Sequence, residues 1–128
     1  MSYYVSKMVE GNFDEVVGRA TDSLKEQGFG VLTEIDVDQV LKKKLDVDFR
    51  RYKILGACNP HFAYQALQSE DKVGTMLPCN VIIRQTEEGQ VEAAAVDPLA
   101  SMQAIKNQSL EEIAIEVKEK LTRVITQL

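Results

Sequence analysis

The residues best suited to chemistry in this chain are its only two cysteines and its only histidine. Cys58 and His61 lie in "GACNPHFAYQAL", and Cys79 lies about twenty residues later in "MLPCNVII". An asparagine follows each cysteine, at Asn59 and at Asn80. Thiol and imidazole groups serve as nucleophiles, general bases and soft-metal ligands. These two segments are therefore the candidate functional site.

A metal site is one interpretation of these residues. Cys58, His61 and Cys79 offer two sulfurs and one nitrogen, a donor set suited to Zn or Cu(I). Cys58 and His61 are three residues apart at the expected start of a helix, and a hairpin beginning at Cys79 would bring the second thiol alongside them. A closed structural zinc site requires four ligands, and this set supplies three.

A thiol enzyme is a second interpretation, with Cys58 as nucleophile and His61 as base. Cys58 is expected at a strand-to-helix junction, where the helix dipole lowers the pKa of a thiol. A base must also be oriented by a third group. The side chains available for that role are Asn59, Asn80, Glu34 and Asp97.

The alternative to both interpretations is that the two thiols only pack. Reduced cysteine is among the most buried residue types and behaves as a small hydrophobe. Asn59 has a structural explanation as a helix cap, and Pro60 has one at the first helical position. We expect a protein that binds a small ligand or a soft metal through Cys58, Asn59, His61, Cys79 and Asn80. A structural or interaction homodimer without a site stays open, and it predicts that mutation of the cysteines alters only stability.

Composition limits the class of protein. The chain has 128 residues, and 45% of them are hydrophobic. A chain of this size and composition can bury one hydrophobic core without disulfides or a structural metal. Residues 1–128 are therefore expected to form a single domain. A formal net charge of -5 argues against nonspecific nucleic-acid binding. The N-terminus lacks a leader pattern, and no segment is long and apolar enough to span a membrane. These features predict a cytoplasmic protein with reduced thiols.

Hydrophobic periodicity predicts alternating strands and helices. Strands are expected over 4–9, 29–36, 50–58, 79–85 and 90–96. Helices are expected after caps at Asn12, Asp36 and Asn59, over 98–105, and after a capping box of Ser109 and Glu112. The last helix carries a long apolar stripe, and Ile125 and Leu128 on it could serve a dimer. The pattern predicts an α+β fold with two layers: a mostly antiparallel sheet of about four to five strands, with helices packed on one face.

The segments "RYKILGACNPHFAYQAL", "VGTMLPCNVIIRQ" and "VEAAAVDP" occur in an order that resembles the bacterial and archaeal family catalogued as domain of unknown function 302. The resemblance begins at "EGNFDEVVGRATDSLKEQGFGVLTEIDV" and covers nearly the whole chain. It implies a small α+β domain that forms a dimer. No established activity accompanies it, so the resemblance supports the fold and leaves the ligand to be argued from the residues.

Overall fold

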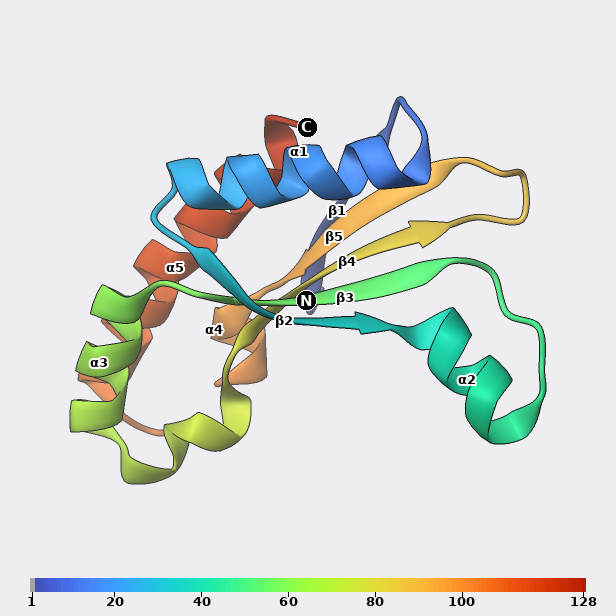
Figure 1. The fold of residues 1–128 in the computed structure, drawn as a ribbon. Helices are drawn as coiled ribbons and strands as arrows, with labels where there is room; N and C mark the ends of the chain where they lie inside the picture. The colour runs from blue at the N-terminus through green and yellow to red at the C-terminus, as the bar shows by residue number, and fades with distance from the viewer. Residues whose placement is uncertain (1) are drawn as a thin grey trace.

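A computed structural model describes residues 2–128 and shows a five-stranded sheet with helices packed against it (Figure 1). The strands are β1 (Tyr4–Val9), β2 (Gly30–Asp36), β3 (Tyr52–Cys58), β4 (Cys79–Gln85) and β5 (Val91–Val96). The helices are α1 (Phe13–Glu26), α2 (Val37–Leu45), α3 (Pro60–Ser69), α4 (Pro98–Ser101) and α5 (Gln108–Thr126), with a 3-10 helix η1 (Asp71–Met76) after α3.

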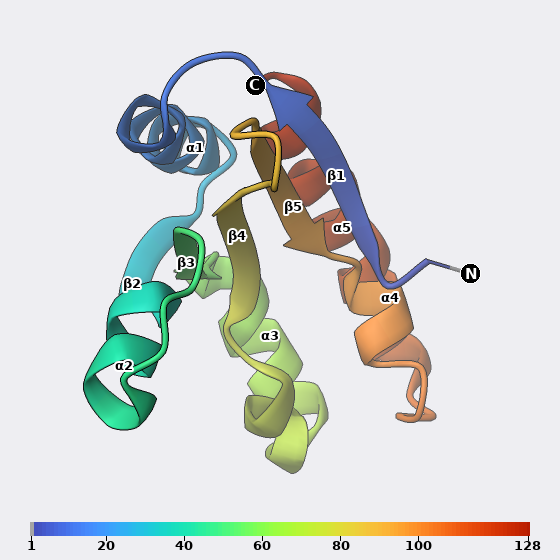
Figure 2. The ribbon, with the colours of Figure 1, turned by 90° about the vertical axis from the view of Figure 1, so that its right-hand side faces the viewer.

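The strand order in the sheet is β1-β5-β4-β3-β2, and every neighbouring pair is antiparallel. The hairpin of β4 and β5 supplies two of the three inner strands, and β1 from the N-terminus adds to β5 (Figure 2). The predicted α+β fold with an antiparallel sheet is therefore confirmed.

Helices α1 and α5 pack together on one face of the sheet. The apolar stripes of the two helices, represented by Leu24 and Leu121, meet Leu55, Val81 and Ile83 from the central strands in one core cluster. Side chains alternate between the faces of a strand, so every second residue of β3, β4 and β5 enters this core. The buried Ser23 hydroxyl donates to the backbone carbonyl of Val124 at 3.0 Å and ties α1 to α5.

The opposite side of the sheet, here called the open face, has a different lining. Its side chains form three rows across the strands, set by the pairing register. They are Met8, Glu92, Arg84 and Tyr52; then Ser6, Ala94, Ile82, Ile54 and Ile35; then Tyr4, Val96, Asn80, Gly56 and Thr33. A shallow depression of about 520 Å³ on this face is lined by strand residues and Tyr3, and no helix residue among residues 2–128 contributes to it.

Two helix starts show how local chemistry fixes the elements. The Asn12 side chain accepts from the Glu15 N–H at 2.9 Å and donates to the Glu15 carboxylate at 2.7 Å, which confirms the predicted cap of α1. The predicted capping box at Ser109 is wrong, because α5 begins two residues earlier and Asn107 accepts from the Leu110 N–H at 3.2 Å. Asn107 also donates to the Ser69 carbonyl, so a contact distant in sequence holds the true cap in place.

Two other expectations are corrected. The helix predicted over 98–105 ends at Ser101, and a turn follows it. The polar stretch after α3, for which no element was predicted, forms η1, and its Val73 is buried. Ile125, predicted as part of a dimer surface on the last helix, is fully buried in the core between α5 and the sheet. It is therefore not available to a partner.

Candidate functional site

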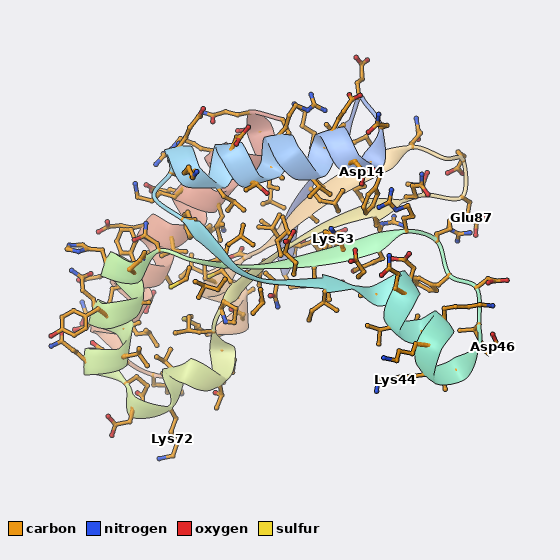
Figure 3. All side chains as sticks on the ribbon, in the orientation of Figure 1. Asp14, Lys44, Asp46, Lys53, Lys72 and Glu87 are labelled. Atoms are coloured by element: carbon orange, nitrogen blue, oxygen red, sulfur yellow. The ribbon has the colours of Figure 1, made fainter. Side chains whose placement is uncertain are left out.

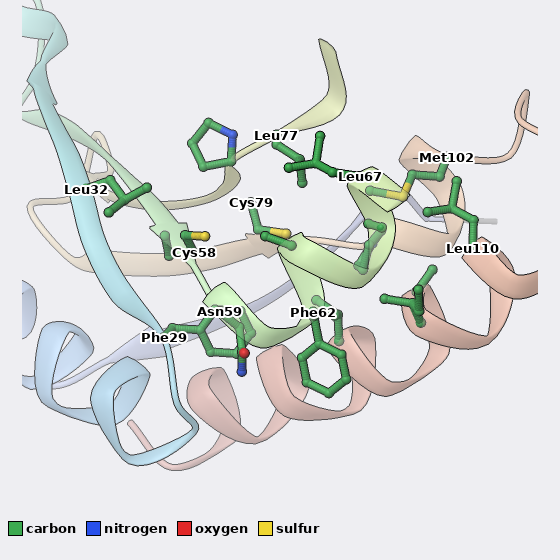
Figure 4. A pocket seen from close by; sticks show the side chains of 18 residues that line it. Phe29, Leu32, Cys58, Asn59, Phe62, Leu67, Leu77, Cys79, Met102 and Leu110 are labelled. Carbon is green, nitrogen blue, oxygen red and sulfur yellow. The ribbon is translucent and has the colours of Figure 1, made fainter. Parts of the chain in front are cut away.

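A cavity of about 300 Å³ lies beside α3, where β3 ends and β4 begins (Figure 4). Its walls come from β2, β3, α3, β4, α4 and α5 and from the segment before β4. The residues that line it are Phe29, Leu32, Ala57, Cys58, Asn59, Phe62, Ala63, Ala66, Leu67, Leu77, Pro78, Cys79, Pro98, Met102, Leu110, Ile113, Ala114 and Val117. The cavity thus joins both segments that the sequence singles out.

The two thiols reach this cavity from neighbouring strands. Ala57 faces Cys79 directly in the β3–β4 ladder, and Cys58 is the next residue along β3. Cys58 is half-buried and Cys79 is buried, and both are free thiols. Burial raises the pKa of Cys79 from 9.0 to about 11, with a further contribution from the nearby Cys58. Cys79 is therefore a neutral thiol near pH 7.

Asn59 lines the cavity but does not cap α3. It occupies the position before Pro60, yet its side chain makes no capping hydrogen bond to the helix. Its amide instead donates to the Gln27 carbonyl at 3.4 Å, and a Cβ on Gly28 would lie 3.0 Å from the same nitrogen. The prediction that the Asn59 side chain caps α3 is wrong, because its amide bonds to the turn after α1 instead.

The structure does not bring the other two predicted ligands into the cavity. His61 lies in the first turn of α3 with an exposed side chain, and it is not part of the cavity lining. Asn80 follows Cys79 on β4, so its side chain points to the open face, where it lines the shallow depression. A strand alternates its side chains, and the residue next to a buried thiol therefore faces away from it.

The predicted metal set of Cys58, His61 and Cys79 is not assembled in this structure. Among residues 2–128, no three side chains of the types His, Cys, Asp and Glu are grouped as ligands for one ion. The two thiols share the cavity, while the imidazole lies outside its lining. The polar side-chain groups in the lining are the two thiols and the Asn59 amide, so these are the groups available to a cation.

Two ion pairs lie at the end of the sheet far from the cavity. Arg51 pairs with Asp14 and Arg50 pairs with Glu87, each at 3.1 Å, beside the start of β3. Figure 3 shows Asp14 and Glu87 at the end of the sheet opposite to α3. No charged side chain among residues 2–128 lines the cavity. Its polar groups are the Asn59 amide and the two thiols, which suits a neutral apolar molecule.

Most of the cavity wall was missed by reasoning from the sequence. Phe29, Phe62, Met102 and Leu110 carry no pattern that distinguishes them from ordinary core residues. Their only sequence signal is apolar character at the ends of predicted elements. Helix α5 and the segment around α4 meet α3 through tertiary packing, which residue spacing does not encode.

Fold and cavity together define an α+β domain with an apolar, ligand-sized pocket at one end of an antiparallel sheet. Residues 5–128 match the family model described as "Domain of unknown function DUF302", and the chain belongs to this family. It is similar to a crystal structure of an uncharacterized conserved DUF302 protein from Bacillus stearothermophilus. The TM-score is 0.92 and the identity 28%, over 99% of this chain and 98% of the other. No curated protein matches the chain.

None of the helices over residues 2–128 is both long enough and apolar enough to cross a membrane.

Proposed function

We propose that this protein binds a small, neutral, predominantly apolar molecule in the cavity beside α3. The observation that carries the proposal is the cavity itself. It is about 300 Å³ in volume, its wall is apolar, and its few polar groups are the Asn59 amide and the thiols of Cys58 and Cys79. Ligand sites in proteins typically combine an apolar wall with a few polar groups that orient the bound molecule.

The mouth of the cavity supports an apolar ligand. Leu32 on edge strand β2 is 66% exposed and Leu67 on α3 is 45% exposed, and both side chains line the cavity. A bound molecule would remove these leucines from water. Burial of apolar surface contributes about 25 cal/mol per Å², so covering about 200 Å² would supply about 5 kcal/mol before the costs of binding.

A titration with the neutral fluorophore N-phenyl-1-naphthylamine tests the proposal. We expect saturable fluorescence enhancement at one equivalent in the wild type. Ala63→Leu fills the cavity from α3 and should weaken binding at least about tenfold. Gln65→Leu adds the same residue to the exposed side of α3, outside the lining, and should leave the affinity unchanged. Equal affinity in both variants, or no enhancement in the wild type, would contradict the proposal.

A soft cation is the second candidate occupant, favoured by the presence of both thiols in one cavity. If a soft cation binds there, the wild type should bind one equivalent of Cu(I) or Zn under reducing conditions. Both Cys58→Ala and Cys79→Ala should lose this binding. His61→Ala should retain the metal, because that side chain is exposed and does not line the cavity. Metal binding that survives either cysteine mutation would remove this candidate.

A further inference from the structure

We infer that Cys58 and Cys79 form a dithiol site that an apolar organic hydroperoxide oxidises to a disulfide within one chain. The inference rests on the proposed function, because the oxidant must enter the same apolar cavity beside α3. Both thiols line this cavity, and both are free. They are the only two cysteines of the chain, so each is the only thiol partner that the other has within it.

The β3–β4 ladder brings the two cysteines together. Ala57 faces Cys79 directly, and Cys58 is the next residue along β3. With about 5 Å between facing residues and a rise of about 3.3 Å along a strand, the Cα atoms of Cys58 and Cys79 are roughly 6 Å apart. Disulfides span Cα distances of about 4.4 to 6.8 Å. The pair is therefore close enough for a disulfide without a large movement of either strand.

The direction of the side chains agrees with this spacing. Neighbouring residues inside a strand point to opposite faces, but β3 ends at Cys58 and β4 begins at Cys79. The cavity lies across these two strand ends, and both thiols reach it. Figure 4 shows the sulfur of Cys58 pointing toward Cys79. Cys58 is also close enough to contribute to the raised pKa of Cys79.

The two thiols have different parts in the oxidation. Cys58 is half-buried and accessible to an oxidant, while Cys79 is only 8% exposed. The Cys58 thiolate attacks the terminal oxygen of the hydroperoxide and the O–O bond breaks. The alkoxide leaves as an alcohol, after it takes from solvent the proton that the Cys58 thiol released. Cys58 is then a sulfenic acid.

The second step consumes the sulfenic acid. The sulfur of Cys79 attacks the sulfur of Cys58, the S–O bond breaks, and the leaving hydroxide takes the thiol proton of Cys79 to form water. In total, two thiols lose two electrons and two protons. One hydroperoxide is reduced to one alcohol and one water, so the oxidation needs no further reactant.

The wall of the cavity favours an oxidant with a hydrocarbon body. Apart from the two thiols and Asn59, the side chains of the lining are apolar, and Leu32 and Leu67 expose apolar surface at the mouth. A hydrocarbon group buried against this wall holds the peroxide near Cys58 and raises its effective concentration there. Hydrogen peroxide has no such group and gains nothing from the wall.

Oxidation of the reduced protein with one equivalent of cumene hydroperoxide tests the site. We expect the intact chain to lose the mass of two hydrogen atoms. Proteolysis without reductant should then give the Cys58 and Cys79 peptides joined by a disulfide. Cys79→Ser should stop at a sulfenic acid on Cys58, which dimedone traps, and Cys58→Ser should keep its remaining thiol. No disulfide in the wild type, a disulfide between two chains, or dimedone on Cys79 instead of Cys58 would overturn the inference.

Two cavity variants test the class of oxidant, with the rate of disulfide formation measured in acid-quenched samples. Ala63→Leu fills the cavity and should slow oxidation by cumene hydroperoxide at least about fivefold, but should leave oxidation by hydrogen peroxide within about twofold of the wild type. Gln65→Leu, outside the lining, should match the wild type with both oxidants. Equal slowing of both oxidants in Ala63→Leu, or slowing of neither, would overturn the assignment of an apolar hydroperoxide.

Disulfide formation and ligand binding are measured independently, because mass spectrometry needs no fluorophore. A protein that binds N-phenyl-1-naphthylamine but forms no disulfide would contradict the dithiol site alone. A protein that forms the disulfide but does not bind the fluorophore would contradict the proposed ligand binding and leave the dithiol site standing.

Discussion

Cys58 lies one residue beyond Ala57, which faces Cys79 across the β3–β4 ladder, and both thiols line the same cavity. They do so in different environments. Cys58 is half-buried at the junction with α3, while Cys79 is buried at the start of β4. Because burial disfavours the thiolate, two cysteines of one cavity should differ in reactivity.

Alkylation should distinguish the two thiols. Near pH 8, iodoacetamide should modify Cys58 at least about ten times faster than Cys79, because the thiolate of Cys79 is rare at that pH and the side chain is covered. Peptide mass spectrometry of timed samples measures both rates in one protein. Cys58→Ala leaves Cys79 as the only thiol and isolates its rate. Equal rates for the two cysteines in the native protein would contradict the burial argument.

The raised pKa of Cys79 makes stability fall at alkaline pH. Its pKa is about 11 in the folded state and about 9.0 when unfolded, so between these values the unfolded chain loses the thiol proton while the folded one keeps it. The free energy of unfolding should therefore fall by about 2 to 3 kcal/mol across this window, and the stability is fully present below pH 9.

The contribution of Cys79 is isolated by comparing wild type with a variant that lacks this thiol. Urea unfolding of wild type and Cys79→Ala between about pH 8 and 11 should give curves that converge as pH rises, because the variant lacks the titrating group. Parallel curves would show that Cys79 does not titrate in this way.

Gly56 occupies a position with no room for a side chain. A Cβ there would lie 2.2 Å from the Thr33 hydroxyl oxygen and 2.9 Å from Cγ of Pro78. Gly56→Ala should reduce the free energy of unfolding by about 2 kcal/mol or more, because β2 or the Pro78 segment must move. Gly18→Ala is the matched control, since a Cβ at Gly18 meets no atom within 4 Å and should stabilise α1 by about 0.5 to 1 kcal/mol. Thermal unfolding of both variants checks the opposite signs.

Replacement by alanine should lower the free energy of unfolding by different amounts at two asparagines that precede helices. Asn12→Ala removes both hydrogen bonds to Glu15 and should cost about 1 kcal/mol of stability. Asn59→Ala removes only a hydrogen bond of 3.4 Å to Gln27 and no helix cap, so it should cost at most about 0.5 kcal/mol. Chemical unfolding of both variants gives the comparison, and a larger cost at Asn59 would contradict the structure.

The parts of the fold that sequence predicts well are those with local causes. The β4–β5 hairpin follows from alternation around the turn at Gly89, and α1 follows from the Asn12 cap and its apolar stripe. The start of α5 is missed because Ser109 and Glu112 form an equally good local pattern, and the choice of Asn107 depends on its contact with Ser69. Competition between local signals is resolved by tertiary contacts.

The candidate site is predicted in part for the same reason. Cys58, Asn59 and Cys79 line the cavity because β3 ends beside the start of β4, and the sequence alone does not determine that these two strands pair. His61 and Asn80 differ because a single position along a helix or strand decides which way a side chain points. The remaining wall of the cavity comes from residues between Pro98 and Val117, in α4, α5 and the segment that joins them. No short sequence motif indicates that these elements pack at this place.

Elements from the N-terminal part of the chain contact elements from its C-terminal part, and this affects how the protein folds during synthesis. Strand β1 has β5 as its neighbour, and the hydroxyl of Ser23 bonds to a carbonyl 101 residues later. A ribosome makes the N-terminal strand and helix first, but their partners emerge last. Because α1 also packs against β2, β4 and β5, its apolar stripe is covered in steps, and the last step requires α5. Completion of this fold is set by the arrival of α5, and a stalled nascent chain would expose the surface that chaperones bind.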